Sequence, residues 1–266
     1  MDPIRESFLQ GFIRLSLWYV RNAAQEGNES LEDIVNCRVD IYRNTKFFDG
    51  KNHPSSGEVD PEWTEILTRL GEIYERRKDD PPQRFEAEGL AALWPHLVMT
   101  AEDDQKAKKR PYECWTYDLR DAGNLNLHIS NVYQPRSPLS DMRIPFAASL
   151  LRMVRGCRSR RPDVNDVRCG TWMNSVPRFQ ALFPKAWEKS MVIASELNYT
   201  QGFWGQFVDR RGDFHEKNGE KFRETGQLPF PCSVCECRID KLMSHVQRRF
   251  PKAVQYNKKR KKERAH

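Results

Sequence analysis

The sequence lacks the short motifs that mark the commonest catalytic and nucleotide-binding sites. It contains no G-x-x-x-x-G-K-[ST], G-x-G-x-x-G, G-x-S-x-G or H-E-x-x-H segment. These absences argue against a P-loop NTPase, a dinucleotide-binding enzyme, an α/β-hydrolase and a zinc protease of the usual kinds. The reaction, if there is one, has to be inferred from individual residues and their setting.

Long apolar runs and an export signal are also missing. The longest apolar run near the N-terminus, residues 15–20, is interrupted by Ser16 and is far shorter than a membrane span. The seven cysteines are an odd number, and three of them lie within six residues, which does not fit a secreted disulfide framework. We therefore predict a reduced, cytoplasmic protein that has no membrane partner.

Excess positive charge is absent from most of the chain. Nine Lys or Arg and one acidic residue lie between Arg248 and His266, which gives 9 − 1 = +8, whereas the whole chain carries +7. The other 247 residues, 266 − 19, therefore sum to 7 − 8 = −1. Residues 248–266 are a candidate contact for nucleic-acid phosphates, and we expect residues 251–266 to be a disordered basic tail.

The chain does contain enough apolar and aromatic residues for a folded core. Hydrophobic residues make up 38% and aromatic residues 11% of the 266, which argues against wholesale disorder. The patterns predict an α+β protein with a mainly helical region over 1–100, a charged linker over 101–111, and a sheet-containing α/β region over 112–250.

Apolar residues recur every three or four positions in several segments, which is typical of amphipathic helices. The predicted helices lie at residues 4–24, from 61, from 83, and at 145–158, 177–190, 213–225 and 239–250. Alternation of apolar and polar residues predicts strands at 112–118, 125–130, 164–172 and 202–208. The first two of these are expected to form a hairpin. The segment 31–48 is ambiguous, although residues 35–42 alternate as a half-buried strand would.

The strongest metal-binding signal is Cys232-x2-Cys235-x-Cys237, followed by His245. Thiolate and imidazole are ligands that tetrahedral zinc prefers, so we predict a structural zinc site. The alternative is that these cysteines are buried thiols without a ligand. In a nucleic-acid-associated protein, this cluster would be a small zinc module beside the basic tail.

Two strand ends carry polar side chains suited to a ligand site. His128 follows strict alternation in the segment LNLHIS and runs into Asn131 and Arg136; histidine exchanges protons near neutral pH, so it is a candidate acid or base. Asn174 and Ser175 follow the predicted strand 164–172. The alternatives are a hydrogen-bonded structural histidine and a helix cap.

A third candidate segment is rich in aromatic and amide side chains. Trp204, Gln206 and Asp209 would line a pocket for a flat or hydroxylated ligand, or belong to an edge strand that ends in a turn. We predict that His128 and Asn174 are catalytic. The predicted ligand-binding residues are Asn131, Arg136, Ser175, Trp204, Gln206 and Asp209.

The hairpin, the helix 145–158, the strand 164–172 and the segment from Asn174 to Phe183 distantly resemble the core of a GNAT-like acyltransferase. That resemblance implies acyl transfer. The family's pyrophosphate loop is glycine-rich, whereas residues 131–144 contain Pro135 and Pro138 and no glycine, which argues against an acyl-CoA donor. The segments LHISN, CGTWMNS and FWGQFVDRRG resemble segments of bacterial proteins and imply no activity.

The sequence thus predicts an enzyme or small-molecule-binding protein with its pocket at strand ends, and acyl transfer as the reaction. The alternative is a nucleic-acid-associated protein.

Overall fold

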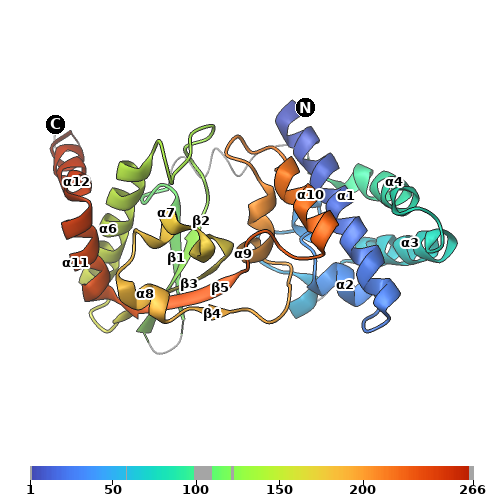
Figure 1. The fold of residues 1–266 in the computed structure, drawn as a ribbon, viewed down its shortest axis with the longest axis horizontal. Coiled ribbons are helices and arrows are strands. Elements are labelled where there is room, and N and C mark those ends of the chain that lie inside the picture. Colours follow the sequence, from blue (N-terminus) through green and yellow to red (C-terminus); the bar gives the residue numbers. More distant parts are fainter. Residues whose placement is uncertain (1, 58, 99–109, 121–122, 264–266) are drawn as a thin grey trace. The chain divides into compact units, whose positions relative to one another are not determined.

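The computed structural model describes residues 2–57, 59–98, 110–120 and 123–263. The chain divides into two compact units (Figure 1). Unit 1 comprises Met1–Ala101 and Glu196–Pro229, and unit 2 comprises Glu102–Ser195 and Phe230–His266. One division between the units falls between Ala101 and Glu102, and residues 196–229, predicted as part of the sheet-containing region, belong to the helical unit. The predicted linker 101–111 lies outside the described residues except for its last two.

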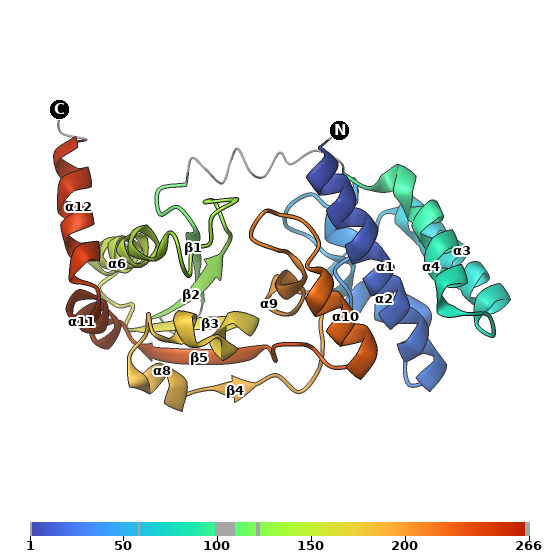
Figure 2. The same ribbon diagram turned by 45° about the horizontal axis from the view of Figure 1, so that its top comes forward.

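Unit 1 is built on the long helix α1 (Pro3–Glu26). Asp2 accepts a hydrogen bond from the Ile4 backbone N–H at its start, and Gly27 ends it in the left-handed conformation with φ 73°. The buried side of α1 packs against α4 (Pro82–Leu93), and α4 in turn packs against α3 (Pro61–Arg77) (Figure 2). The helices predicted at 4–24, from 61 and from 83 are thus confirmed.

The alternating residues 35–42 do not form a strand. Residues Leu31–Cys37 form helix α2, because the Ser30 hydroxyl accepts a hydrogen bond from the Asp33 N–H and starts the helix there. Three short 3-10 turns complete the first segment of unit 1: η1 (Tyr42–Asn44), η2 (Pro54–Ser56) and η3 (Trp94–His96).

The strand predicted at 202–208 is wrong. This segment forms α9 (Gln201–Trp204) and η6 (Gly205–Phe207), followed by α10 (Glu216–Thr225). Its aromatic residues Phe203, Trp204 and Phe207 have a helical spacing, and the Trp204 ring lies 5.6 Å from that of Phe12 in α1. Because these aromatic residues are buried against α1, the segment belongs to unit 1.

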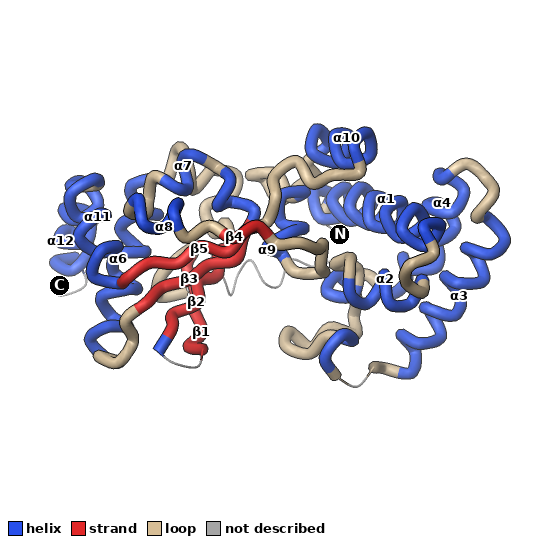
Figure 3. Tube along the Cα trace, turned by 60° about the horizontal axis from the view of Figure 1, so that its bottom comes forward, coloured by secondary structure: helices blue, strands red, loops and turns tan. Residues whose placement is uncertain are grey.

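Unit 2 contains one five-stranded sheet in the order β1-β2-β3-β5-β4 (Figure 3). The strands are β1 (Trp115–Arg120), β2 (Asn124–Ile129), β3 (Asp166–Thr171), β4 (Val192–Ile193) and β5 (Ser233–Arg238). Only the pair β2 and β3 is parallel; the other pairs are antiparallel. The predicted hairpin and the strand at 164–172 are confirmed, whereas β4 and β5 were not predicted.

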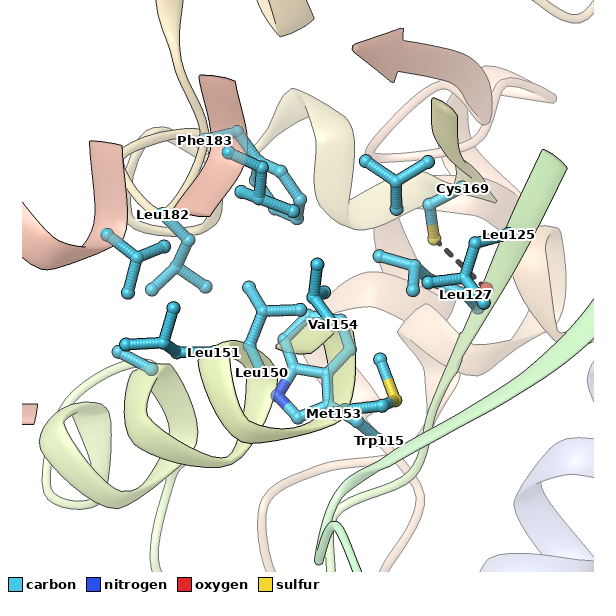
Figure 4. Packing of buried hydrophobic residues seen from close by; sticks show 14 of the residues in the cluster. Trp115, Leu125, Leu127, Leu150, Leu151, Met153, Val154, Cys169, Leu182 and Phe183 are labelled. Atoms are coloured by element: carbon cyan, nitrogen blue, oxygen red, sulfur yellow. Dashed lines mark hydrogen bonds between the residues drawn. The ribbon is translucent and has the colours of Figure 1, made fainter. Parts of the chain in front are cut away.

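The helices of unit 2 are α6 (Arg143–Arg160), α7 (Pro177–Gln180), α8 (Lys185–Lys189), α11 (Ile239–Arg249) and α12 (Pro251–Glu263), with η5 at Trp172–Ser175. One face of the sheet packs on these helices and forms the core (Figure 4). The Trp115 indole stacks on Phe146 at 4.5 Å and donates its N–H to the Phe146 carbonyl. The fold is therefore α+β, as predicted.

The predicted disordered tail is helix α12 as far as Glu263. Ala253 is fully buried and Val254 partly buried in the core of unit 2. Apolar contact with the body is what orders this basic segment, because a free basic helix of this length would be only marginally stable in water. None of the described helices combines the length and the apolar character needed to cross a membrane.

Candidate functional site

The sheet of unit 2 has a second face on which the polar residues gather. Alternation in β2 buries Leu125 and Leu127 in the core and turns Asn126 and His128 to the other side. The same alternation in β3 exposes Arg168, and in β5 it exposes Glu236. We call this second side the open face.

The strand register sets residues of the open face in a row. Asp118 of β1 pairs with Asn126 of β2, Asn126 with Arg168 of β3, and Arg168 with Glu236 of β5. His128 lies two residues along β2 from Asn126, and Cα atoms at such diagonal positions are about 7–8 Å apart, within reach of an arginine side chain. The register therefore brings an imidazole, carboxylates and a guanidinium to one surface.

Asp118 and His128 form a polar pair on the open face. The His128 Nε2 lies 2.9 Å from the Asp118 Oδ2, and the Asn126 amide nitrogen lies 3.4 Å from the same oxygen. The two side chains are 51% and 49% exposed, so solutes can reach them. An ionised carboxylate only accepts, so Nε2 carries the proton and Nδ1 of the neutral ring is left as a base.

Arg168 is the second notable group on the open face. It is exposed, and among the described residues no side chain forms a hydrogen bond or an ion pair with its guanidinium. In contrast, the neighbouring Arg238 is paired with Asp166 at 3.4 Å. A guanidinium without a protein partner is suited to bind a carboxylate or phosphate.

Asn174, which was predicted to be catalytic, forms hydrogen bonds within unit 2 through its whole side-chain amide. It is fully buried; its amide nitrogen donates to the carbonyls of Cys169 at 3.0 Å and Ser233 at 2.8 Å, and its Oδ1 accepts from the Trp187 indole at 3.0 Å. With both amide hydrogens and the oxygen engaged, it ties the end of β3 to β5 and α8. It has no donor left for a substrate.

The neighbouring predicted ligand residues mostly shape loops. The Asn131 amide donates to the Arg136 carbonyl at 3.1 Å, and its Oδ1 accepts from the Tyr133 N–H at 3.0 Å, which holds the turn after β2. The Ser175 hydroxyl donates to the Pro231 carbonyl at 3.0 Å. The side chain of Arg136 is exposed.

The other predicted ligand residues belong to unit 1, and two of them are buried in it. Trp204 is fully buried and donates to the Arg38 carbonyl at 2.9 Å, and Gln206 is 1% exposed and donates to the Phe203 carbonyl. Asp209 accepts from the Arg211 and Asp213 N–H groups within a turn. Trp204 and Gln206 are therefore buried in unit 1 and hydrogen-bonded to its backbone.

The predicted zinc ligands are not gathered around one point. Cys235 and Cys237 face the apolar core, and the His245 Nε2 lies 3.2 Å from the Ala181 carbonyl. Burial raises the pKa of Cys235 to about 11 and that of Cys232 and Cys237 to about 12, so each is a thiol at neutral pH. Among the described residues no three His, Cys, Asp or Glu side chains are arranged to hold a metal ion. The arrangement lends no support to the zinc prediction.

Sequence reasoning identified His128 and missed Asp118 and Arg168. The hairpin pairing could have identified Asp118, because it lies on the same face as His128 once the turn is fixed. Arg168 could not be placed beside them without knowing that β3 joins β2 in parallel.

A scan against protein-family models and searches of curated proteins and of solved structures found no match to the chain.

Proposed function

We propose that unit 2 acts on a small molecule at the open face of its sheet, with His128 as the general base, and that the reaction is an acyl transfer. The observation that carries this proposal is the 2.9 Å contact between the Asp118 carboxylate and the His128 imidazole on an accessible surface. A carboxylate bound to one ring nitrogen fixes the tautomer and leaves the other nitrogen to take a proton.

The proton transfer follows from this geometry. As a hydroxyl or amine of the acceptor attacks the acyl carbonyl, its proton passes to Nδ1 of His128, and Asp118 stabilises the imidazolium that forms. The proton then leaves with the departing group of the acyl donor. Arg168, which lies on β3 opposite Asn126 and so diagonal to His128, would bind an anionic group of one substrate.

The order of elements supports acyl transfer as the reaction class. The hairpin β1–β2, the crossover helix α6, the parallel strand β3 and the short helices after Asn174 follow the order on which the resemblance to GNAT-like acyltransferases rests. Because residues 131–144 contain no glycine, acyl-CoA is not assigned as the donor.

The test is a screen of the full chain with simple acyl donors. Release of nitrophenol from p-nitrophenyl acetate, and of thiol from short acyl thioesters, is followed with a panel of primary amines and alcohols as acceptors. We expect turnover that His128→Gln lowers about 100-fold or more, which is the usual share of a general base. Asp118→Asn should lower turnover less, because the imidazole remains.

Asp163→Asn is the matched control. It removes an exposed carboxylate of the same unit that is paired with Arg161, and it should leave turnover unchanged. Absence of turnover by the wild-type chain with every donor, or equal turnover by His128→Gln, would refute the proposal.

A further inference from the structure

Helices α11 and α12 carry a stretch of positive charge without any acidic residue. From Lys241 to Arg260 the sequence holds no Asp or Glu. Its basic residues are Lys241, Arg248, Arg249, Lys252, Lys258, Lys259 and Arg260. Because unit 2 orders this stretch as helix, the charges have fixed positions on its surface.

One side of α12 is bound to the body by polar and apolar contacts. The Asn257 amide donates to the Ala148 carbonyl at 2.7 Å and accepts from the Arg152 guanidinium at 2.9 Å. Arg260 pairs with Glu113, whose carboxylate also accepts from Arg152 at 3.1 Å. The Glu113 side chain is 13% exposed, so this ion pair is largely shielded from solvent.

The other side of α12 faces solvent. Lys252, Tyr256 and Lys259 are exposed and are spaced at i, i+4 and i+7, so they lie along one stripe about 10 Å long. Tyr256 is 37% exposed. Arg248 and Arg249 at the end of α11 extend the same basic surface. An aromatic ring between two cations has the elements needed to hold both the phosphates and a base of a polynucleotide.

We propose that the exposed side of α11 and α12 binds single-stranded nucleic acid, with the lysines and arginines on the phosphates and Tyr256 stacked on an unpaired base. This surface is separate from the open face, and the inference does not depend on acyl transfer. An anionic membrane fits less well, because Ala253 and Val254 pack into unit 2, and Tyr256 is the one large hydrophobic side chain exposed among the described residues of α12.

The experiment measures binding of a fluorescently labelled 20-nucleotide oligo-dT and oligo-U to the full chain between 50 and 300 mM salt. We expect the affinity to fall steeply with salt, and the double variant Lys252→Gln/Lys259→Gln to reduce the slope of log Kd against log salt by about 1.4, at about 0.7 per phosphate contact. Tyr256→Ala should weaken binding about tenfold at constant slope, and Tyr256→Phe should not.

Lys217→Gln/Lys221→Gln is the matched control. It removes the same charge from exposed positions of α10, and it should leave affinity and slope unchanged. Equal effects of the two double variants, or oligonucleotide affinity unaffected by Lys252→Gln/Lys259→Gln, would overturn the proposal. Tighter binding to a matched duplex, or to phosphatidylcholine–phosphatidylserine vesicles, would overturn it as well, since either result would show that single-stranded nucleic acid is not the preferred ligand.

Discussion

Asn174→Asp tests whether this residue holds the fold of unit 2 or serves a ligand. The change keeps the shape of the side chain but replaces the amide nitrogen, which donates to the Cys169 and Ser233 carbonyls, with an oxygen. An ionised carboxylate would face both carbonyl oxygens in a fully buried site. Folding therefore requires the new carboxyl to be protonated, and the protonated form can donate to only one of the two carbonyls.

The expected loss of stability has two parts. The missing hydrogen bond leaves a buried carbonyl unsatisfied and costs about 1–2 kcal/mol at any pH. Keeping the carboxyl protonated above its unfolded-state pKa, which is near 4, costs at most about 1.4 kcal/mol for each further pH unit. At pH 7 this second cost is about 4 kcal/mol. The pKa of the new group is raised in the folded state, so its stability is present at low pH and is lost as the pH rises. We expect a free energy of unfolding lower by about 5 kcal/mol at pH 7 and by about 1–2 kcal/mol at pH 4.

Urea denaturation followed by circular dichroism at the two pH values measures these differences. Hydrogen exchange of peptides from β3 and β5 assigns the effect to unit 2. Asn131→Asp is the control: it also loses an amide donor, to the Arg136 carbonyl, but at an exposed hydrogen bond, and the new carboxylate still accepts from the Tyr133 N–H. An Asn174→Asp protein with wild-type stability and exchange at pH 7 would refute the structural role.

Three further predictions concern unit 1 and are measured by urea unfolding. Gly219→Ala should lower the free energy of unfolding by about 1–3 kcal/mol, because the new Cβ would lie 2.5 Å from the Phe214 ring. Gly71→Ala, where the Cβ meets open space, should raise it by up to about 1 kcal/mol. Equal effects of the two substitutions would contradict this packing. Burial raises the pKa of Asp40 to about 8. The free energy of unfolding should therefore decrease as the pH rises from about 4 to 8, by at most about 1.4 kcal/mol per pH unit. Asp40→Asn should reduce this dependence on pH. Burial lowers the pKa of His53 to about 4. The stability that the neutral ring contributes above about pH 6.5 should therefore be lost as the pH falls toward about 4. A His53→Gln variant whose free energy of unfolding falls just as much between about pH 6.5 and 4 would disprove this.

Local patterns were sufficient where an element carries its own start, stop and apolar side. Helix α1 has its Asp2 cap, its stripe of apolar residues and Gly27, so its limits could be predicted within two residues. The hairpin β1–β2 was predicted for the same reason, since alternation and a turn specify it locally. The segment 202–208 failed because aromatic residues fit a strand as well as a helix, and only burial against α1 decides between them.

The sequence by itself determined the α+β class, the hairpin that carries His128, and the concentration of positive charge near the C-terminus. Only the tertiary structure decided which residues lie next to these features. Parallel pairing of β2 with β3 brought Arg168 into register with Asn126 and Asp118, while contacts separated by more than a hundred residues buried Trp204 and ordered α12 through Asn257. Such long-range contacts leave no periodic trace in the sequence, because they depend on which surfaces meet after the local elements have formed.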